Sequence, residues 1–168
     1  VILTDGREIG TKNVISAVHP SLTMRMIPEE KIRKTYRKRI LGLENSPGFF
    51  SVYMIMKKDR FRYRNYNHFH YSSDSYFDDH LGTWPDSYLL YTPAVEQQAE
   101  FSQTASILAF MDYKVFQKWE SVPPSKRGEA YEVFKEEAAE KLIGLAEKRY
   151  PGLRSDIASY FVSTPLTF

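Results

Sequence analysis

Two histidines at alternating positions are the first residues in this sequence that could do chemistry. His68 and His70 would share one face of a strand, because successive strand side chains point to opposite faces. That spacing suits two imidazole ligands of a metal ion. A third ligand could come from Asp78, Asp79 or His80, but these belong to another element, and no H-E-x-x-H pattern accompanies them. We therefore expect polar histidines in an aromatic strand and no metal.

A second candidate is the run of residues 57–64 (KKDRFRYR), which interleaves cations with aromatic side chains. This composition is typical of grooves that follow phosphates and stack bases. It also suits an exposed strand edge whose charges prevent pairing with another strand. No RRM, KH, OB or helix-turn-helix signature accompanies it, so nucleic acid is not an expected partner. A nucleic-acid or anionic-surface module using the basic residues 31–64 remains the alternative function.

The familiar catalytic and phosphate-binding motifs are absent from the sequence. It contains no cysteine, which excludes disulfides and cysteine-ligated zinc, and no G-x-S-x-G nucleophile motif. It has neither G-x-G-x-x-G nor a Walker loop, so a dinucleotide fingerprint would have to lie outside these 168 residues. The adjacent Asp78 and Asp79 could form an acid–base pair only if both lined a cleft. The catalytic residues are therefore unknown.

The composition fits one globular domain, or a domain excised from a larger protein. Hydrophobic residues make up 42% of the 168 and aromatic residues 15%, and aromatic side chains are common in sites for bulky apolar ligands. No apolar run is long enough for a transmembrane helix, and the first residues do not form a signal peptide. We expect a cytoplasmic location. The chain begins and ends in strand-like sequence, which predicts a fragment.

Charge is distributed unevenly along the chain. Residues 1–64 hold 14 Lys/Arg against 6 Asp/Glu, whereas residues 65–168 hold 9 against 15. Such asymmetry permits an anionic membrane surface, a nucleic acid or an acidic partner domain. Charged helix faces exposed to solvent are the simpler explanation of the asymmetry, and we favour it.

Three elements are expected in the first third of the chain. Asp5-Gly6 predicts a hairpin turn with residues 7–17 as the returning strand, and residues 13–18 (NVISAV) read as a strand buried on both faces. Ser21 is expected to cap a short helix. Pro28 then begins a longer helix, and its apolar stripe is expected to be buried, so that Ile40→Asp would cost about 3 kcal/mol or more. That stripe consists of Ile32, Tyr36, Ile40 and Leu43.

The remainder of the chain mixes strands and helices without strict alternation. This predicts an α+β fold with a largely antiparallel sheet covered by helices, one of them long and C-terminal. Tyr131, Phe134, Ala138, Leu142 and Leu145 form the apolar stripe of that long helix. The strands are expected at residues 49–56, 87–91, 106–113 and 158–162, and the helices at residues 73–81 and 125–149.

The first of these strands supplies the candidate ligand-binding residues. One parity (Val52, Met54, Met56) or the other (Ser51, Tyr53, Ile55) must pack under the long helix, and the remaining set could line a cavity. Sequence does not decide which, so Tyr53, Met54 and Ile55 are all candidates, with Tyr53 and Ile55 favoured. Met adapts to ligand shape and Tyr offers area with a polar tip. The alternative is that helices cover both faces.

Three stretches together resemble FAD-dependent phytoene desaturases and retinol saturases, which are related in build to amine oxidases. The first is residues 5–20, a hairpin and a strand that end at His19-Pro20. The second is residues 22–28 with the later SPGFFSVYM at 46–54, which resembles the entry into the substrate domain. The third is residues 163–168 (STPLTF), which resembles the segment before a C-terminal flavin motif.

The resemblance implies a single substrate-binding domain, residues 1–168, of a larger FAD-dependent oxidoreductase. Its substrate would be hydrophobic and polyene-, carotenoid- or retinoid-like, in a desaturase or saturase reaction. FAD would be present in the full-length protein but not retained by this chain, with His19 and Pro20 near the flavin. The expected partners are the substrate, the protein's own FAD-binding domain and a peripheral membrane surface.

Overall fold

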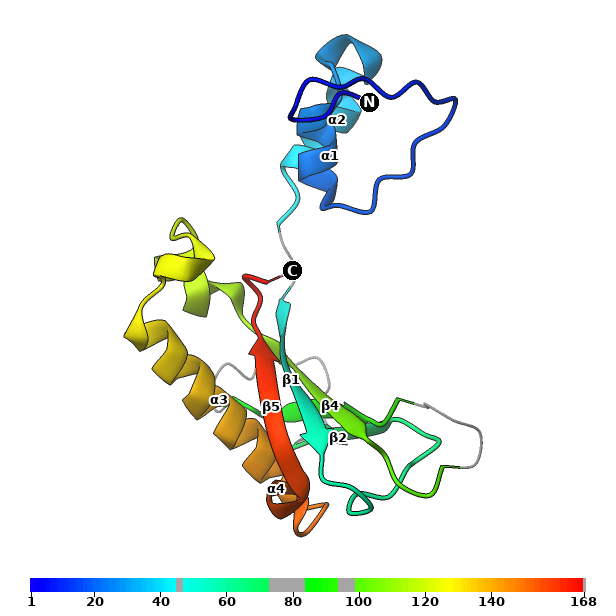
Figure 1. Cartoon of the computed structure of the whole chain (residues 1–168). Helices are drawn as coiled ribbons and strands as arrows, with labels where there is room; N and C mark the ends of the chain where they lie inside the picture. Colours follow the sequence, from blue (N-terminus) through cyan, green and yellow to red (C-terminus); the bar gives the residue numbers. More distant parts are fainter. Residues whose placement is uncertain (45–46, 73–83, 94–98, 168) are drawn as a thin grey trace. The chain divides into compact units, whose positions relative to one another are not determined.

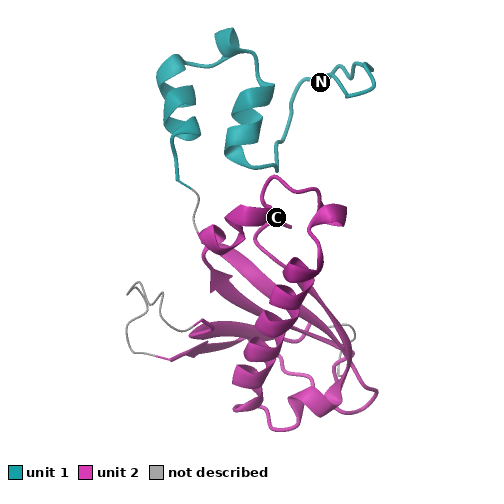
Figure 2. Ribbon diagram, turned by 90° about the vertical axis from the view of Figure 1, so that its left-hand side faces the viewer, with its two compact units in different colours: residues 1–46 teal, residues 47–168 magenta. Residues whose placement is uncertain are grey.

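The computed structural model describes residues 1–44, 47–72, 84–93 and 99–167, and the chain divides into two compact units. Unit 1 is residues 1–46 and unit 2 is residues 47–168 (Figure 2). The helix expected at residues 73–81 lies outside the described residues. With η marking a 3-10 helix, the elements in chain order (Figure 1) are α1 (Pro20–Met26), η1 (Glu29–Lys31), α2 (Lys34–Leu41), β1 (Gly48–Met56), β2 (His68–Tyr71), β3 (Ser87–Tyr91), β4 (Thr104–Met111), η2 (Tyr113–Trp119), η3 (Pro124–Lys126), α3 (Glu129–Glu147), α4 (Leu153–Asp156) and β5 (Ile157–Ser163).

Unit 2 is built on a five-stranded sheet in the order β2-β3-β4-β1-β5. Each pair of neighbouring strands is antiparallel. The α+β fold with a largely antiparallel sheet is therefore confirmed. The strands predicted at residues 49–56, 87–91, 106–113 and 158–162 are present within about two residues of their expected ends, which is the usual uncertainty of such boundaries. Strand β1 is an interior strand between β4 and the edge strand β5, and it is the longest of these five strands.

Helix α3 covers one face of this sheet, which we call the covered face (Figure 1). Its predicted stripe is confirmed, because Tyr131, Ala138 and Leu142 are buried and the other two members are partly buried in the same core. The helix begins at Glu129 instead of about 125, because Gly128 has a positive φ of 77° that breaks the preceding turn. From β5, the hydroxyl group of Tyr160 donates a hydrogen bond to Glu136 of α3.

In unit 1, the hairpin turn at Asp5-Gly6 is present, but the strand predicted at residues 13–18 is wrong. Gly6 has a φ of 83°, and the Leu3 amide donates to the Arg7 carbonyl at 2.9 Å. Residues 13–18 form no strand, and Ile15 is 96% exposed. A buried strand requires hydrogen-bonding neighbours, and among the described residues none pairs with this segment.

The single long helix predicted after Pro28 is also wrong. Ile32 has an extended backbone (φ −130°, ψ 140°) and separates η1 from α2. No residue of α2 is buried, and Tyr36 is 46% exposed. Short helices present too little apolar surface to one another to bury a full stripe. The cap of α1 differs as well. The N-cap residue is His19 instead of the predicted Ser21, and its ring nitrogen accepts a hydrogen bond from the Ser21 amide.

Candidate functional site

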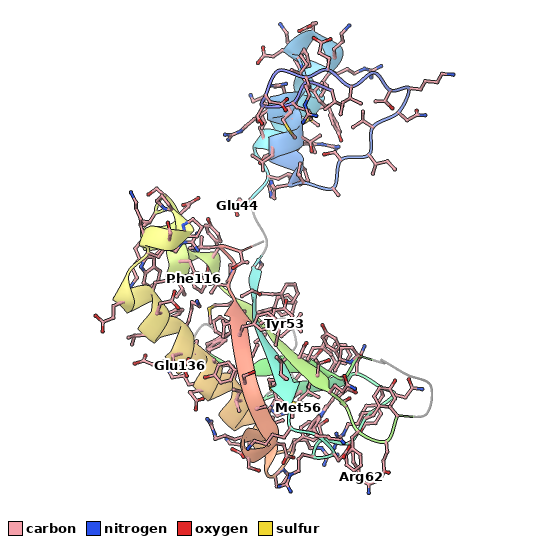
Figure 3. All side chains as sticks on the ribbon, viewed as in Figure 1. Glu44, Tyr53, Met56, Arg62, Phe116 and Glu136 are labelled. Atoms are coloured by element: carbon pink, nitrogen blue, oxygen red, sulfur yellow. The ribbon has the colours of Figure 1, made fainter. Side chains whose placement is uncertain are left out.

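The face of the sheet opposite α3, which we call the open face, carries the candidate site. Along β1 the even-numbered residues from Phe50 to Met56 are at most 5% exposed and belong to the core. The odd-numbered residues point the other way, because strand side chains alternate. Tyr53 and Met56 therefore lie on opposite faces of the same strand (Figure 3).

The registers of the strands arrange the open face into cross-strand rows. The serine row runs across all five strands through Ser163, Ser51, Leu108, Leu89 and Phe69. A second, aromatic row runs through Phe161, Tyr53, Ser106 and Tyr91. On the other side of the serine row, Phe49 pairs with Phe110. The two ring pairs flanking the serine row are close, with centroids 4.6 Å apart for Phe49–Phe110 and 4.9 Å for the stacked Tyr53–Phe161.

Large apolar side chains on this face are exposed to solvent. Phe161 is 61% exposed, Phe69 55% and Phe110 50%. On an antiparallel sheet with one solvated face, polar residues normally occupy that face. A contiguous exposed aromatic surface instead marks a ligand- or protein-binding site.

The structure separates the three residues that sequence proposed as substrate-lining. Tyr53 is half-buried and Ile55 is 48% exposed, and both lie on the open face. Met54 is 1% exposed and packs into the core on the covered face. Sequence reasoning missed Phe110 and Phe161, because only the pairing register, which is not encoded locally, brings them beside β1.

His19 and Pro20 lie at the start of α1 in unit 1, and the His19 ring hydrogen-bonds to the neighbouring Ser21. Its Nδ1 lies 2.8 Å from the Ser21 hydroxyl oxygen and accepts the Ser21 amide. A flavin dinucleotide is normally held by a Gly-rich loop after a strand, with its pyrophosphate at a helix N-terminus. Helix α1 has seven residues and no strand before it, so the described residues do not fit a pyrophosphate cradle. The proximity of His19 and Pro20 to a flavin stays a prediction.

His68 and His70 lie on the covered face of β2, and both of their rings contact Tyr88. The His68 Nδ1 is 2.5 Å from the Tyr150 hydroxyl oxygen, and the His70 ring stacks on Tyr88 at 5.0 Å. Partial burial, with smaller effects from nearby Arg149, His70 and Arg64, lowers the pKa of His68. Burial also raises the pKa of Tyr88 to about 12. Within the described ranges no group of three or more potential metal ligands gathers, and residues 78–80 lie outside those ranges.

Phe61, one of the two aromatic residues in the run 57–64, is packed within unit 2. Phe61 is 4% exposed, and the Arg64 guanidinium lies over both its ring (4.8 Å) and the Tyr150 ring (4.5 Å). Lys57 donates to the Ser155 carbonyl at 2.7 Å. Base stacking requires accessible aromatic faces, and this segment does not offer Phe61 for that purpose.

A basic hollow of about 550 Å³ lies in unit 1, between η1 and α2. Three of its residues are the cations Lys31, Arg33 and Arg39, and none of them forms an ion pair within the described part of the chain. The Arg39 guanidinium lies 5.4 Å from the centre of the Tyr36 ring, which also lines the hollow. Cations beside an apolar and aromatic wall suit an anionic group attached to an apolar body.

Comparison with known proteins gives one distant similarity. No protein-family model and no solved structure matches the chain. The chain is 28% identical over 169 residues to prolycopene isomerase, a chloroplastic protein of Arabidopsis thaliana. The match covers 99% of this chain and 27% of the plant protein, so the chain spans about a quarter of that relative's length.

The length and apolar character of a helix decide whether it can span a membrane. Crossing a bilayer takes about 20 largely apolar residues. Among the helices described, none has both the length and the apolar character to do so.

Proposed function

We propose that this chain is the substrate-side domain of an FAD-dependent oxidoreductase and that its open face binds a hydrophobic, polyene-like substrate. The observation that carries the proposal is the exposed aromatic surface on a sheet whose other face carries the hydrophobic core. The similarity to prolycopene isomerase, a protein named for its action on prolycopene, supports this ligand class. The direction of the reaction and the electron acceptor are left open.

The flavin and the protein around it would have different roles in such an enzyme. A flavin supplies the redox chemistry, and the surrounding protein supplies binding, orientation and exclusion of water. In this chain the open face would bind the apolar substrate through Phe49, Tyr53, Phe110 and Phe161. The flavin would be held by an FAD-binding domain formed by residues outside this chain.

The ligand-binding role is tested by comparing the two faces of β1 in the chain of residues 1–168. Tyr53→Ala removes open-face area and should weaken binding of all-trans-retinol, used as a polyene probe, by about tenfold. Met54→Ala is the matched control, which should cost about 2 kcal/mol or more of stability and leave affinity unchanged. The read-outs are quenching of tryptophan fluorescence and urea unfolding. Unchanged probe affinity in Tyr53→Ala would show that the open face is not the binding site.

The assignment of the flavin to residues outside the chain has its own test. Purified from a host that makes FAD, the chain should be colourless, because its described residues offer no pyrophosphate cradle. Visible absorbance spectroscopy gives the answer. A stoichiometric flavin spectrum would contradict this assignment while leaving the ligand-binding role intact.

We also propose that the basic hollow of unit 1 contacts an anionic membrane surface, from which a lipophilic substrate would be drawn. Juxtaposed Lys and Arg side chains contribute about 1 kcal/mol each near an anionic leaflet. The paired variant Arg33→Gln/Arg39→Gln should lose binding to phosphatidylglycerol-containing vesicles at low salt. Lys126→Gln/Lys148→Gln removes two exposed cations of unit 2 and should retain it. Equal loss in both pairs, or no sedimentation of the original chain, would refute this role.

A further inference from the structure

Two serine hydroxyl groups on the open face are buried without hydrogen-bond partners in the described part of the chain. Ser51 of β1 is 0% exposed and Ser163 of β5 is 8% exposed, and neither Oγ atom has a hydrogen-bond partner within the residues that the structure describes. The two residues are directly opposite each other in the β1–β5 register. Both have the parity of the open face, so their side chains point away from α3.

This arrangement is unfavourable for a sheet that serves only as scaffold. Most buried polar side chains in native proteins have a partner. Leaving a buried hydroxyl unsatisfied costs about 1–3 kcal/mol, whereas alanine at the same position would carry no such cost. Two neighbouring hydroxyl groups of this kind, between the Phe49–Phe110 and Tyr53–Phe161 ring pairs, indicate a partner that is absent from the free chain.

The chemistry of the surrounding face narrows the identity of that partner. The residues in its cross-strand rows are aromatic, aliphatic or hydroxyl-bearing, and none of them is charged. A carboxylate or phosphate would therefore lose its hydration without gaining a counter-ion, which is strongly unfavourable. A neutral oxygen can accept or donate a hydrogen bond with a serine hydroxyl.

We propose that the ligand of the open face is an apolar chain ending in a neutral oxygen group, an alcohol or a carbonyl, which hydrogen-bonds to Ser51 and Ser163. This inference rests on the proposed function and specifies its substrate class. The apolar part would follow the serine row over Leu108 and Leu89 to Phe69. The whole row from Ser163 to Phe69 crosses four interstrand spacings of about 4.8 Å and is about 19 Å long, which suits an extended isoprenoid chain with its oxygen at the serine end.

Entry of the ligand requires only local movement. The rings beside the serine pair have room to rotate, because Phe110 is 50% and Phe161 61% exposed. Exposed side chains change rotamer within nanoseconds. A ligand can thus displace these rings and reach the hydroxyl groups without unfolding a strand.

The experiment compares three probes of the same carbon skeleton on the chain of residues 1–168. All-trans-retinol ends in a hydroxyl group, axerophthene has hydrogen in its place, and retinoic acid ends in a carboxylate. Their conjugated systems quench tryptophan emission at a distance, and Trp84 is anchored to the same sheet, since its ring packs against Phe50 and its Nε1 donates to the Phe110 carbonyl at 2.7 Å. Retinol should bind about tenfold more tightly than axerophthene, the size of one good hydrogen bond, and more tightly than retinoic acid.

The double variant Ser51→Ala/Ser163→Ala should abolish the preference for retinol over axerophthene by weakening retinol alone. Its urea unfolding should show equal or greater stability, because the removed hydroxyl groups had no partner in the free chain. Ser102→Ala is the matched control, since its Oγ is also buried without a partner but lies outside the open-face rows. It should leave the preference intact.

Three results would overturn the proposal. Equal binding of retinol and axerophthene by the original chain would show that the serine pair recognises no oxygen. A destabilised double variant would show that the hydroxyl groups already have partners in the chain. If neither probe binds at all, the proposed function fails as well, and this outcome is distinct from equal binding, which refutes only the oxygen recognition.

Discussion

Units 1 and 2 differ in what their apolar residues contact. In the described part of unit 1, Met24 is the single buried hydrophobic residue, whereas Ile15 and Leu43 are 96% and 62% exposed. The hydrophobic core cluster lies entirely in unit 2, between Phe50 and Leu153. Both units contain apolar runs, so the difference lies in the surfaces available to cover them. An apolar pattern predicts where a chain requires burial, but burial depends on a packing partner.

The same contrast recurs within unit 2 between the two faces of its sheet. Helix α3 packs on the covered face, and the open face exposes its aromatic side chains. In unit 1 the exposed apolar residues include Leu22 and Met26 of α1, and no described contact assigns a role to either of them. On the open face the ring pairs and the buried serine hydroxyl groups add chemistry to exposure. Exposure therefore indicates a site only where additional chemistry accompanies it.

The largest effect is expected in the core of unit 2. Leu142→Ala on α3 removes a side chain that is 0% exposed and should cost about 2–5 kcal/mol, through lost burial and the cavity left behind. Val133→Ala on the same helix is the control, because Val133 is 48% exposed and should change stability by less than about 0.5 kcal/mol. Urea unfolding measures both. Similar values would mean that α3 does not seal the covered face.

A smaller effect is expected where α3 is tied to the end of β5. The Tyr131 hydroxyl oxygen lies 2.8 Å from the Thr164 hydroxyl oxygen, and both residues are buried. Tyr131→Phe should cost about 1–2 kcal/mol, because a buried hydroxyl loses a partner. Tyr36→Phe in the exposed unit 1 should leave thermal unfolding unchanged. A neutral Tyr131→Phe would show that the pair contributes little to the core.

The elements of unit 2 were predictable from sequence because their signals are local. The alternation in β1 and the stripe of α3 are each contained in one segment, and the structure confirms both. The strand predicted at residues 13–18 failed because pairing depends on neighbours that a local pattern does not contain. The choice between Tyr53 and Met54 depended on the side on which α3 packs. The bond between His68 and Tyr150 joins residues 82 positions apart and leaves no local signal.

The pH dependence of stability offers a test confined to unit 2. Because partial burial lowers the pKa of His68 below 6.5, the unfolded chain binds a proton more readily than the folded chain. Stability contributed by neutral His68 is thus full above about pH 6.5 and is lost as pH falls toward the lower folded value. Arg149, Arg64 and His70 act in the same direction.

His68→Gln should flatten this acid-side loss in urea titrations between about pH 7 and about pH 5. His19→Gln in unit 1 should retain the profile of the original chain. If both variants kept the same acid-side slope, His68 would not be the group responsible, and the slope would have to arise from carboxylates elsewhere.

The smallest effect is expected for Ile40→Asp in α2, where the sequence pattern alone predicts a loss of about 3 kcal/mol or more. The structure leaves Ile40 only half-buried, so the new carboxylate can reach water. Asp in the last turn of a helix is disfavoured by the macrodipole, by about 0.3–1 kcal/mol. The net cost should be about 1 kcal/mol or less, seen as a modest loss of helical circular dichroism.

Tryptophan emission should be unchanged, since both tryptophans lie in unit 2. A loss near 3 kcal/mol with a matching shift in tryptophan emission would mean that α2 shares the core of unit 2, and the contrast between the two units would no longer hold.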